Sequence, residues 1–417
     1  MFESANRRRP SIILFTLGVV LIVLVGAVAL SPRPASANAI TDNNCTSYWS
    51  PPSSRNAFFY PELHATYWYW RYDATVPGGQ NISFRLQGQY PVARNSSYHF
   101  YPTQNGGSAD NSLRDVQIIP DPGSVNPSLP GIDRHALNRS FTLWILPVDN
   151  QRDEPNTLSI TPDSTMPTFM LRAYRADYGY EYGGVPLPTI ESFNATTGEP
   201  VPCPPVPGWI PPVPVDPELG PPASDPIHFY RSGGEGYYPN DDNKYLVARG
   251  DPRTFGKIAI VRFFPPTFLD TYRHPEAVFT GNEEVRYMSL CTGGQISTRT
   301  SQCIADDQFI LNQDGYYNVV VGPNDNTLRA EANSRGYNYL VWYNLKTPML
   351  LYRQMVPHPD FIGSIYNVPR YDPNLPADGQ EAENFIGHYA PIGRYCTPED
   401  FMNGSACGMP VPQPLRP

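Results

Sequence analysis

The sequence has very little lysine, because only three of its 417 residues are lysines, Lys244, Lys257 and Lys346. Its formal net charge is −9, and the first 37 residues hold four arginines against one glutamate, so the rest of the chain carries −12. A surface with this excess of carboxylates repels a phosphate backbone. The composition therefore indicates a protein that does not have nucleic acid as its partner.

Motifs that usually mark catalysis or a metal site are also missing. The sequence has no G-x-S-x-G, H-E-x-x-H, C-x-x-C or EF-hand pattern, and its seven histidines are scattered. His99 follows Ser97 by two positions, which places both on one face of a strand, but this spacing is common by chance. The sequence leans against an enzyme without deciding the question, and it assigns no catalytic residue, metal or cofactor.

There is a single long hydrophobic run, the 19 residues from Ile12 to Leu30. Three arginines precede it at positions 7–9, and Ala35-Ser36-Ala37, the small-x-small pattern of a leader-peptidase site, follows it. We expect residues 1–37 to be a signal peptide or an N-terminal membrane anchor, since 19 apolar residues can span a bilayer as a transmembrane helix. Either way, the bulk of the chain is expected outside the cytoplasm, secreted or at the cell surface, with residues 12–30 as the anchor if uncleaved.

Cysteine is scarce but even in number. An even count in an exported chain indicates disulfides, although six cysteines allow fifteen connectivities and a zinc site is the weaker alternative. Short local loops close readily, so we expect two local disulfides and a third that joins the ends of the first domain. The expected pairs are Cys291 with Cys303, Cys396 with Cys407, and Cys45 with Cys203.

Proline and glycine are abundant, with 49 and 32 residues. The densest proline stretch, residues 199–226, can form neither a helix nor an interior strand, because proline fixes φ and has no backbone N–H. We expect it to be an extended connector. It would join a first domain, residues 38–198, to a second domain with a C-terminal tail, residues 227–417.

Short segments rich in aromatic and β-branched residues recur on both sides of the connector. From Ile82 to Tyr90, apolar and polar side chains alternate, which is typical of a half-buried strand. Further strands are predicted at DVQII and SFTLWIL in the first half and at QFIL and YYNVVVG in the second. No long helical period interrupts them, although Thr397-Pro398-Glu399-Asp400 predicts one short helix. We therefore predict an all-β fold of two tandem antiparallel, jelly-roll-like β-sandwich domains.

The strand series of the two halves match in order, which indicates an internal duplication. ISFRLQG corresponds to IAIVRFF, RNSSYHF to RYMSLCT, and SFTLWILPVDN to YYNVVVGPNDN. The pattern R-x2-S-x17-D occurs in both halves, and the first half then carries an insertion, IPDPGSVNPSLPGIDRHALN, that the second lacks. The pattern is formed by Arg94, Ser97 and Asp115 in one half and by Arg286, Ser289 and Asp307 in the other.

Several of these segments resemble a family of exported bacterial proteins of unknown function. They are VRYMSLC, CIADDQFILNQDGYYNVVV and GHYAPIGRYCTPEDF in the second half and DVQIIPDPGSVNP and GGVPLP in the first. The resemblance spans roughly Tyr67 to Phe401, and each half is loosely similar to a bacterial β-sandwich domain of unknown function. It implies architecture only, because no activity, cofactor or catalytic residue comes with it.

The repeated arginine, serine and aspartate are the first candidates for a binding site. An arginine and an aspartate on neighbouring strands can orient a carboxylate or a sugar hydroxyl, with the serine as a further donor. The alternative, which we favour, is a structural ion pair at equivalent places in two sandwiches. The candidate binding residues are Arg94, Ser97, Asp115, Arg286, Ser289 and Asp307.

Three acidic turns could contribute oxygen ligands to a calcium ion, which needs six to eight. They are Asn240–Asn243, Asn312–Gly315 and Asn324–Asn326. Asparagine and aspartate also form turns by bonding to their own backbone, and this is the interpretation that we favour. Calcium is therefore not assigned, and a calcium-stiffened spacer is the weakest of our functional hypotheses.

Aromatic residues are the remaining candidates. Alternation sends Tyr67 and Tyr69 to one face of a strand and Trp68 and Trp70 to the other, so one pair belongs to the core and the other could stack on a sugar ring. Trp209 in the connector is expected to dock on a domain surface. We therefore expect a non-catalytic binding or structural module, with carbohydrate or cell-envelope components as partners. The alternative is an extracellular hydrolase or isomerase with its site at a sandwich mouth or between the domains.

Overall fold

The structure is a computed structural model, and parts of the chain lie outside its described residues, among them the predicted leader with its apolar run Ile12–Leu30 and the predicted docking residue Trp209. Within the described part, no helix combines the length and the apolar character that crossing a bilayer requires. We call residues 42–198 the first half and residues 227–409 the second half, and contacts group both halves into one compact unit, Thr41–Pro417. The described residues are 42–53, 60–103, 111–150, 152–177, 182–208, 220–233, 238–255, 258–343, 345, 347–405 and 407–409.

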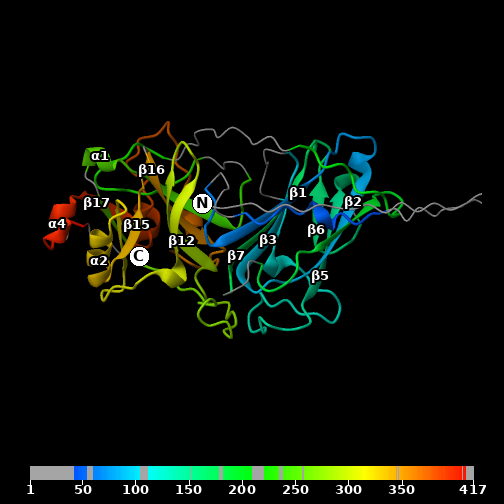
Figure 1. Ribbon diagram of the computed structural model, residues 1–417, viewed down its shortest axis with the longest axis horizontal. Helices are drawn as coiled ribbons and strands as arrows, with labels where there is room; N and C mark the ends of the chain where they lie inside the picture. The colour runs from blue at the N-terminus through cyan, green and yellow to red at the C-terminus, as the bar shows by residue number, and fades with distance from the viewer. Residues whose placement is uncertain are drawn as a thin grey trace, which may run out of the picture. The chain divides into compact units, whose positions relative to one another are not determined.

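The first half contains two four-stranded sheets (Figure 1). Their strands alternate inward and outward side chains, and in the segment beginning at Ile82 the inward set is the predicted one, with Phe84 and Leu86 fully buried. In sheet order, one sheet is β1 (Ala65–Arg71), β7 (Thr168–Ala176), β3 (Ala93–Tyr101) and β4 (Ser112–Arg114). The other is β6 (Thr157–Ile160), β5 (Ser140–Pro147), β2 (Ile82–Gln89) and β8 (Thr189–Asn194).

The second half also contains two sheets. Its strands are more uniformly buried than those of the first half, and all eight residues of Pro348–Met355 are buried. In sheet order, one sheet is β13 (Thr300–Ala305), β12 (Tyr287–Gly294), β16 (Pro348–Met355), β10 (Asn243–Arg249) and β9 (Tyr230–Arg231). The other is β15 (Asn338–Val341), β14 (Tyr317–Gly322), β11 (Ile258–Phe263) and β17 (Ile392–Cys396).

The sheet orders of the two halves coincide, except that the second half has one additional edge strand, β9. The order β1-β7-β3-β4 matches β10-β16-β12-β13, and β6-β5-β2-β8 matches β15-β14-β11-β17. The pairings are antiparallel except for β5 with β6 and β14 with β15, which are parallel and again equivalent. The expectation of purely antiparallel sheets is therefore wrong for two of the four.

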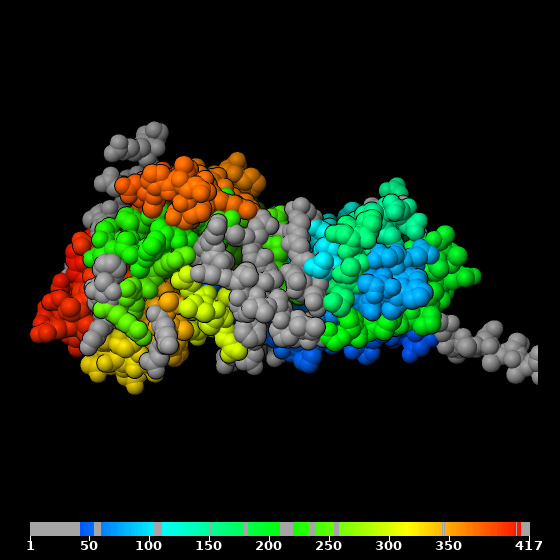
Figure 2. Space-filling model, turned by 90° about the horizontal axis from the view of Figure 1, so that it is seen from above, coloured from blue at the N-terminus to red at the C-terminus, as the bar shows by residue number. Residues whose placement is uncertain are grey.

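Each half has its own apolar core, to which both of its sheets contribute. In the first half, Trp68 and Trp70 of β1 lie in one cluster with Phe84 of β2 and Phe141 of β5. In the second half, Phe263 of β11 and Tyr352 of β16 play the same part. Figure 2 shows the C-terminal residues, orange to red, gathered apart from the blue residues near the N-terminal end of the first half.

Two predicted strands are not strands: DVQII begins with the 3-10 turn Asp115–Gln117, and QFIL begins at Gln308, the last residue of the 3-10 turn Asp306–Gln308. In DVQII, the Asp115 carboxylate accepts from the backbone of Ser96 and Val116, and Gln117 accepts from the backbone of Arg114. In QFIL, Gln308 bonds the backbone of Ala305 in the same way. Side chains that bond nearby backbone compete with a strand ladder, and this explains the error. The 3-10 helices are η1 (Thr46–Tyr48), η2 (Gly79–Asn81), η3 (Asp115–Gln117), η4 (Val148–Asn150), η5 (Asp306–Gln308), η6 (Ile365–Asn367) and η7 (Gly387–Tyr389).

Among the described residues, α-helices are few and all lie in the second half. The predicted start at Thr397 is confirmed, since its hydroxyl accepts from the amide of Asp400 and Pro398 occupies the first turn. The other three α-helices were not predicted, and the longest of them, Asn326–Ser334, is capped by Asp325, which accepts from two backbone amides. The α-helices are α1 (Pro252–Phe255), α2 (Asn326–Ser334), α3 (Glu383–Ile386) and α4 (Pro398–Met402).

The three predicted disulfides are all present. Cys291 and Cys303 face each other directly on β12 and β13, and Cys396 and Cys407 close a short loop after β17. Cys45 and Cys203 join segments 158 residues apart, with Cα atoms separated by 5.6 Å. This last bond holds the beginning of the connector against the first half, where Pro205 accepts a backbone hydrogen bond from Asp73.

We predict that the long-range disulfide stabilises the fold more than a local one. The Cys45–Cys203 bond closes a loop with a sequence separation of 158, against 11 for Cys396–Cys407. Restriction of the unfolded chain grows with the logarithm of loop length, so removing the longer loop should cost about 2 kcal/mol more. Denaturant unfolding of the two double Cys→Ala variants measures the difference, and equal losses would contradict it.

Candidate functional site

The six residues predicted from the repeated pattern lie in one region, where side chains of the two halves contact each other. Arg94 and Ser97 come from β3, and Ser289 comes from β12. All six are removed from solvent, and even the most exposed side chain, that of Arg286, is only 11% accessible. We call the region formed by the six residues and their partners the inter-half contact.

Arg94 is the most completely enclosed of these residues, and its side chain is 0% exposed. Its Nη1 donates to Asp306 Oδ2 of the second half at 2.8 Å. Its Nε donates to Thr271 Oγ1 at 3.0 Å, and its Nη2 to Asp270 Oδ1 at 3.4 Å. The first half thus places a buried cation whose carboxylate partners all belong to the second half.

Charged residues of the second half likewise pair with residues of the first half. Arg286 Nη2 lies 3.6 Å from Asp115 Oδ2 of the first half, and its Nε donates to the backbone carbonyl of Arg94 at 2.9 Å. Asp307 is paired across the contact with Arg175 of the first half, through two hydrogen bonds. The two halves therefore exchange arginines and aspartates reciprocally, and no pair forms inside one half as the pattern had suggested.

The predicted equivalence of Asp115 with Asp307 is off by one residue. Asp115 accepts from the amide of Ser96 at 2.8 Å and from the amide of the next residue at 2.7 Å. Asp306 makes both bonds in the second half, from Met288 at 3.1 Å and from the following amide at 2.8 Å. The interval R-x2-S-x17-D is the same in both halves only because the second half has two adjacent aspartates, and the second of them, Asp307, gives the matching count.

A second reciprocal set surrounds the two candidate serines. Glu62, just before β1, accepts from Ser289 Oγ at 2.6 Å and pairs with Arg353 of β16. On the other side, Asp242, just before β10, pairs with Arg114 of the first half at 2.9 Å. Each half therefore inserts one carboxylate into the sheet of the other. Glu62 was not predicted, and Asp242 was considered only as part of the acidic turn Asn240–Asn243, although an arginine inside the apolar strand PMLLYRQM signals that a buried partner is needed.

Ser97, His99 and Asp242 together resemble a nucleophilic triad in composition. Ser97 Oγ lies 2.9 Å from His99 Nε2, but Asp242 Oδ2 lies 3.8 Å from the same nitrogen. A relay needs the carboxylate at the opposite nitrogen, and His99 Nδ1 is buried without a partner. All three residues are 0% exposed. The arrangement therefore cannot receive a substrate or pass a proton in the required direction.

Burial and charge shift the pKa values of this region in opposite directions. Burial, aided by Arg172, lowers the pKa of His99 to about 4, so the ring is neutral at pH 7. Burial opposes ionisation of Glu62, but Arg353, His64 and Ser289 together lower its pKa to about 2. The pKa of Asp242 is also about 2, because hydrogen bonds and Arg114 outweigh its burial. Both carboxylates are thus charged at neutral pH, and both are engaged with protein partners.

Within the described residues, one group has potential metal-ligand atoms close together, Glu62 with Cys291 and Cys303. The two sulfurs are joined in a disulfide, so they cannot act as thiolates. Among the acidic turns considered for calcium, Asp325 caps α2 and Asp314 pairs with Arg262 at 2.7 Å. These contacts fit the turn interpretation, and calcium binding stays untested.

The insertion that distinguishes the first half reaches the second half. Gly131 donates its amide to the carbonyl of Phe279 at 2.8 Å. The Arg134 guanidinium lies over the Phe279 ring and pairs with Asp177 at 2.9 Å. The Arg286 guanidinium lies over the same ring, 3.6 Å from its centroid. The insertion therefore belongs to the inter-half contact.

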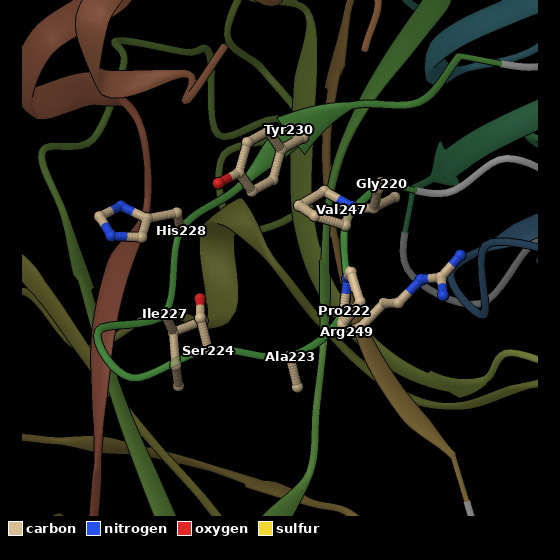
Figure 3. A pocket seen from close by; sticks show the side chains of 10 residues that line it. Gly220, Pro222, Ala223, Ser224, Ile227, His228, Tyr230, Val247 and Arg249 are labelled. Atoms are coloured by element: carbon tan, nitrogen blue, oxygen red, sulfur yellow. The ribbon is translucent and has the colours of Figure 1, made fainter. Parts of the chain in front are cut away.

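A separate shallow hollow, with room for about one water molecule, lies where the connector meets β9 and β10. Figure 3 shows His228 and Arg249 on opposite sides of it, and His228 is held by Glu383. Ser224 donates to the carbonyl of Pro226 at 2.9 Å. The polar groups of this hollow do not converge on one point, so it offers no assembled catalytic set.

The aromatic strand AT-YWYWRY divides as alternation predicted. Trp68 and Trp70 belong to the core, at 3% and 1% exposure. On the opposite face, Tyr67 packs edge-on against Tyr174, and its hydroxyl accepts from the amide of Glu62. Tyr67 thus faces the inter-half contact, where it cannot serve as a sugar platform.

Comparison with known proteins adds little. No family model and no curated protein matches the chain. The crystal structure of an uncharacterized protein from Burkholderia cenocepacia has a TM-score of 0.45 and 11% identity, and the match covers 74% of this chain and 78% of that one. The crystal structure of the VPA0106 protein from Vibrio parahaemolyticus has a TM-score of 0.42 and 10% identity, covering 82% and 92%. The resemblance to a family of exported bacterial proteins remains a prediction.

We predict that Arg94→Met destabilises the protein by about 3–5 kcal/mol, because Asp306 is then buried without its cation. Adding Asp306→Asn should recover part of the loss. The control is Arg85→Met, which removes a pair whose members are 34% and 30% exposed and should cost at most about 1 kcal/mol. Urea unfolding measures the free energy of unfolding of all three variants. Equal losses for Arg94→Met and Arg85→Met would show that the buried pair contributes no more stability than the exposed pair.

Acid should weaken the fold in a defined range of pH. The pKa values of Glu62 and Asp242 are lowered to about 2 from their ordinary 4.5 and 3.8, so their charged forms stabilise the fold above these ordinary values, and this stability is lost as pH falls to 2. We expect the free energy of unfolding to drop between pH 4.5 and 2, and Glu62→Gln to make the drop shallower. Asp360→Asn, a change at a 92% exposed side chain, should leave the drop unchanged.

Proposed function

We propose that this protein is an exported, non-catalytic binding or structural module of the cell surface. In this proposal it consists of two jelly-roll-like β-sandwich domains that arose by internal duplication and are joined by the connector of residues 199–226. The observation that carries the proposal is the reciprocal burial at the inter-half contact. There, the six candidate residues bond to protein partners, which leaves them no role towards a substrate.

The duplication is supported by matching details beyond sheet order. The Asn156 side chain bonds the backbone of Ile119 in both directions and also donates to the carbonyl of Thr142. Asn338 makes the same three bonds in the second half, two with Ile310 and one with Asn318. Independent folds would have no reason to repeat a buried asparagine with the same three partners at the same place between strands.

Export is supported by the disulfides and by the leader expected in residues 1–37. Three disulfides and no free cysteine suit an oxidising compartment outside the cytoplasm. With an anchor or a secreted chain, the acidic surface would face the medium or the cell envelope. Carbohydrate and other envelope components are therefore the partners that we propose.

The second candidate function is an extracellular hydrolase, and the observation in its favour is the contact between Ser97 and His99. Burial of both residues and the position of Asp242 count against it. An enzyme would require the halves to separate, which breaks several buried ion pairs at once.

The test uses the full-length chain expressed in a bacterium. We expect it outside the cytoplasm with its cysteines protected from alkylation, and we expect it to co-sediment with isolated envelope polysaccharide without releasing reducing ends. Reduced protein in the cytoplasm would overturn export. Release of reducing ends, or ester hydrolysis, that Ser97→Ala abolishes but its matched control Ser289→Ala does not, would overturn the non-catalytic role.

A further inference from the structure

One row of side chains crosses the outer face of the sheet β6-β5-β2-β8. Thr157, Trp144, Arg85 and Glu191 are direct neighbours in the strand register, one from each strand. Phe193 lies two residues further along β8, on the same face. Their inward-pointing neighbours, such as Phe84 and Ile145, belong to the core, so the row points away from it.

The equivalent face of the second half is covered by the chain itself. The register places Ile260 and Val320 where Arg85 and Trp144 stand, and both are buried in a cluster with Leu328 of α2 and Phe401 of α4. The first half has the short turn η4 where the second has α2. Here the aromatic and charged residues stay half-buried, with Arg85 34% and Glu191 30% exposed.

The side chains of the row contact one another, yet two of their polar groups have no hydrogen-bond partner among the described residues. The Arg85 guanidinium lies 5.9 Å from the Trp144 ring centroid and 5.3 Å from that of Phe193. Its Nε and Nη2 both donate to Glu191 Oε2, at 3.0 and 2.5 Å. Within the described residues, Glu191 Oε1 accepts no hydrogen bond and the indole N–H of Trp144 donates none.

These groups match the chemistry of a sugar ring. A pyranose presents C–H groups on its flat face, which pack on an aromatic ring, and hydroxyls around its edge, which donate to a carboxylate and accept from N–H groups. The Trp144 and Phe193 rings lie 6.1 Å apart, with the Arg85–Glu191 pair beside them. A hydrophobic partner suits this face less, because a charged pair would be buried with it.

We infer that this outer face, formed by Trp144, Arg85, Glu191 and Phe193, binds a chain of pyranose sugars, for which β-1,4-linked hexasaccharides serve as the test ligands. The indole supplies the stacking surface, Glu191 Oε1 accepts from sugar hydroxyls, and Arg85 orients both. The inference rests on the proposed binding function and names its ligand class and site. The inter-half contact has no part in it.

The experiment titrates the full-length, disulfide-bonded protein with the hexasaccharides of β-1,4-linked glucose, N-acetylglucosamine, mannose and xylose, by calorimetry and tryptophan fluorescence. We expect saturable binding to at least one of them. Trp144→Ala should weaken it about tenfold or more, and Glu191→Gln severalfold, because each removes a different contact. The control Tyr343→Ala alters an aromatic residue of the second half that is 51% exposed, and it should bind normally. Unfolding midpoints confirm that each variant is folded.

The outcomes separate this inference from the broader proposal. Binding that is lost in Trp144→Ala and weakened in Glu191→Gln supports the site. Binding that both variants retain overturns the site but leaves a binding module elsewhere on the protein. No binding to any of the four hexasaccharides overturns the ligand class, whereas cleavage of one of them overturns the non-catalytic function itself.

Discussion

Two arginines that are withdrawn from water, each paired with a carboxylate from the opposite half, constrain the rest of this structure. A buried guanidinium without an anion costs several kcal/mol, and Arg94 finds its anions only in the second half while Arg286 finds its carboxylate in the first. Neither half could expose its sheet face without leaving these charges unpaired. The reciprocal exchange explains why the described chain groups as one unit even though each half has its own core.

The two halves use equivalent surfaces differently. Their inner sheets, with β3 on one side and β12 on the other, contact each other through polar and charged residues and through an apolar cluster that includes Tyr174 of the first half and Tyr287 of the second. Of the outer sheets, that of the second half is closed by α2 and α4, and that of the first half carries Trp144 and Arg85 half in water. In the proposed duplication, the outer sheet of the second half packs against the chain's own helices, whereas that of the first half keeps a face on which a ligand can lie.

The candidate residues show what a repeated sequence pattern could and could not predict. Arg94, Ser97 and Arg286 were identified because they repeat, and they do meet in space. The ion pairs expected within each half form between the halves instead. The correspondence of Asp115 with Asp307 was one residue out of step, because the second half has adjacent aspartates at 306 and 307. Glu62 and Asp242 could not be found in this way, since they lie in irregular segments before their strands and belong to no repeated motif.

Local physical chemistry determined the strands with alternating patterns, the two short-range disulfides and the helix that Thr397 begins, since strand alternation, loop closure and capping act over short stretches. The pair Cys45 and Cys203 then followed by elimination. The common order of the strands could also be read from the sequence, because each strand keeps its own apolar pattern. Only the tertiary structure decided which charges neutralise each other, as the partners Arg94 and Asp306 are 212 residues apart. Their meeting depends on how two folded sheets approach, which no interval along the chain encodes.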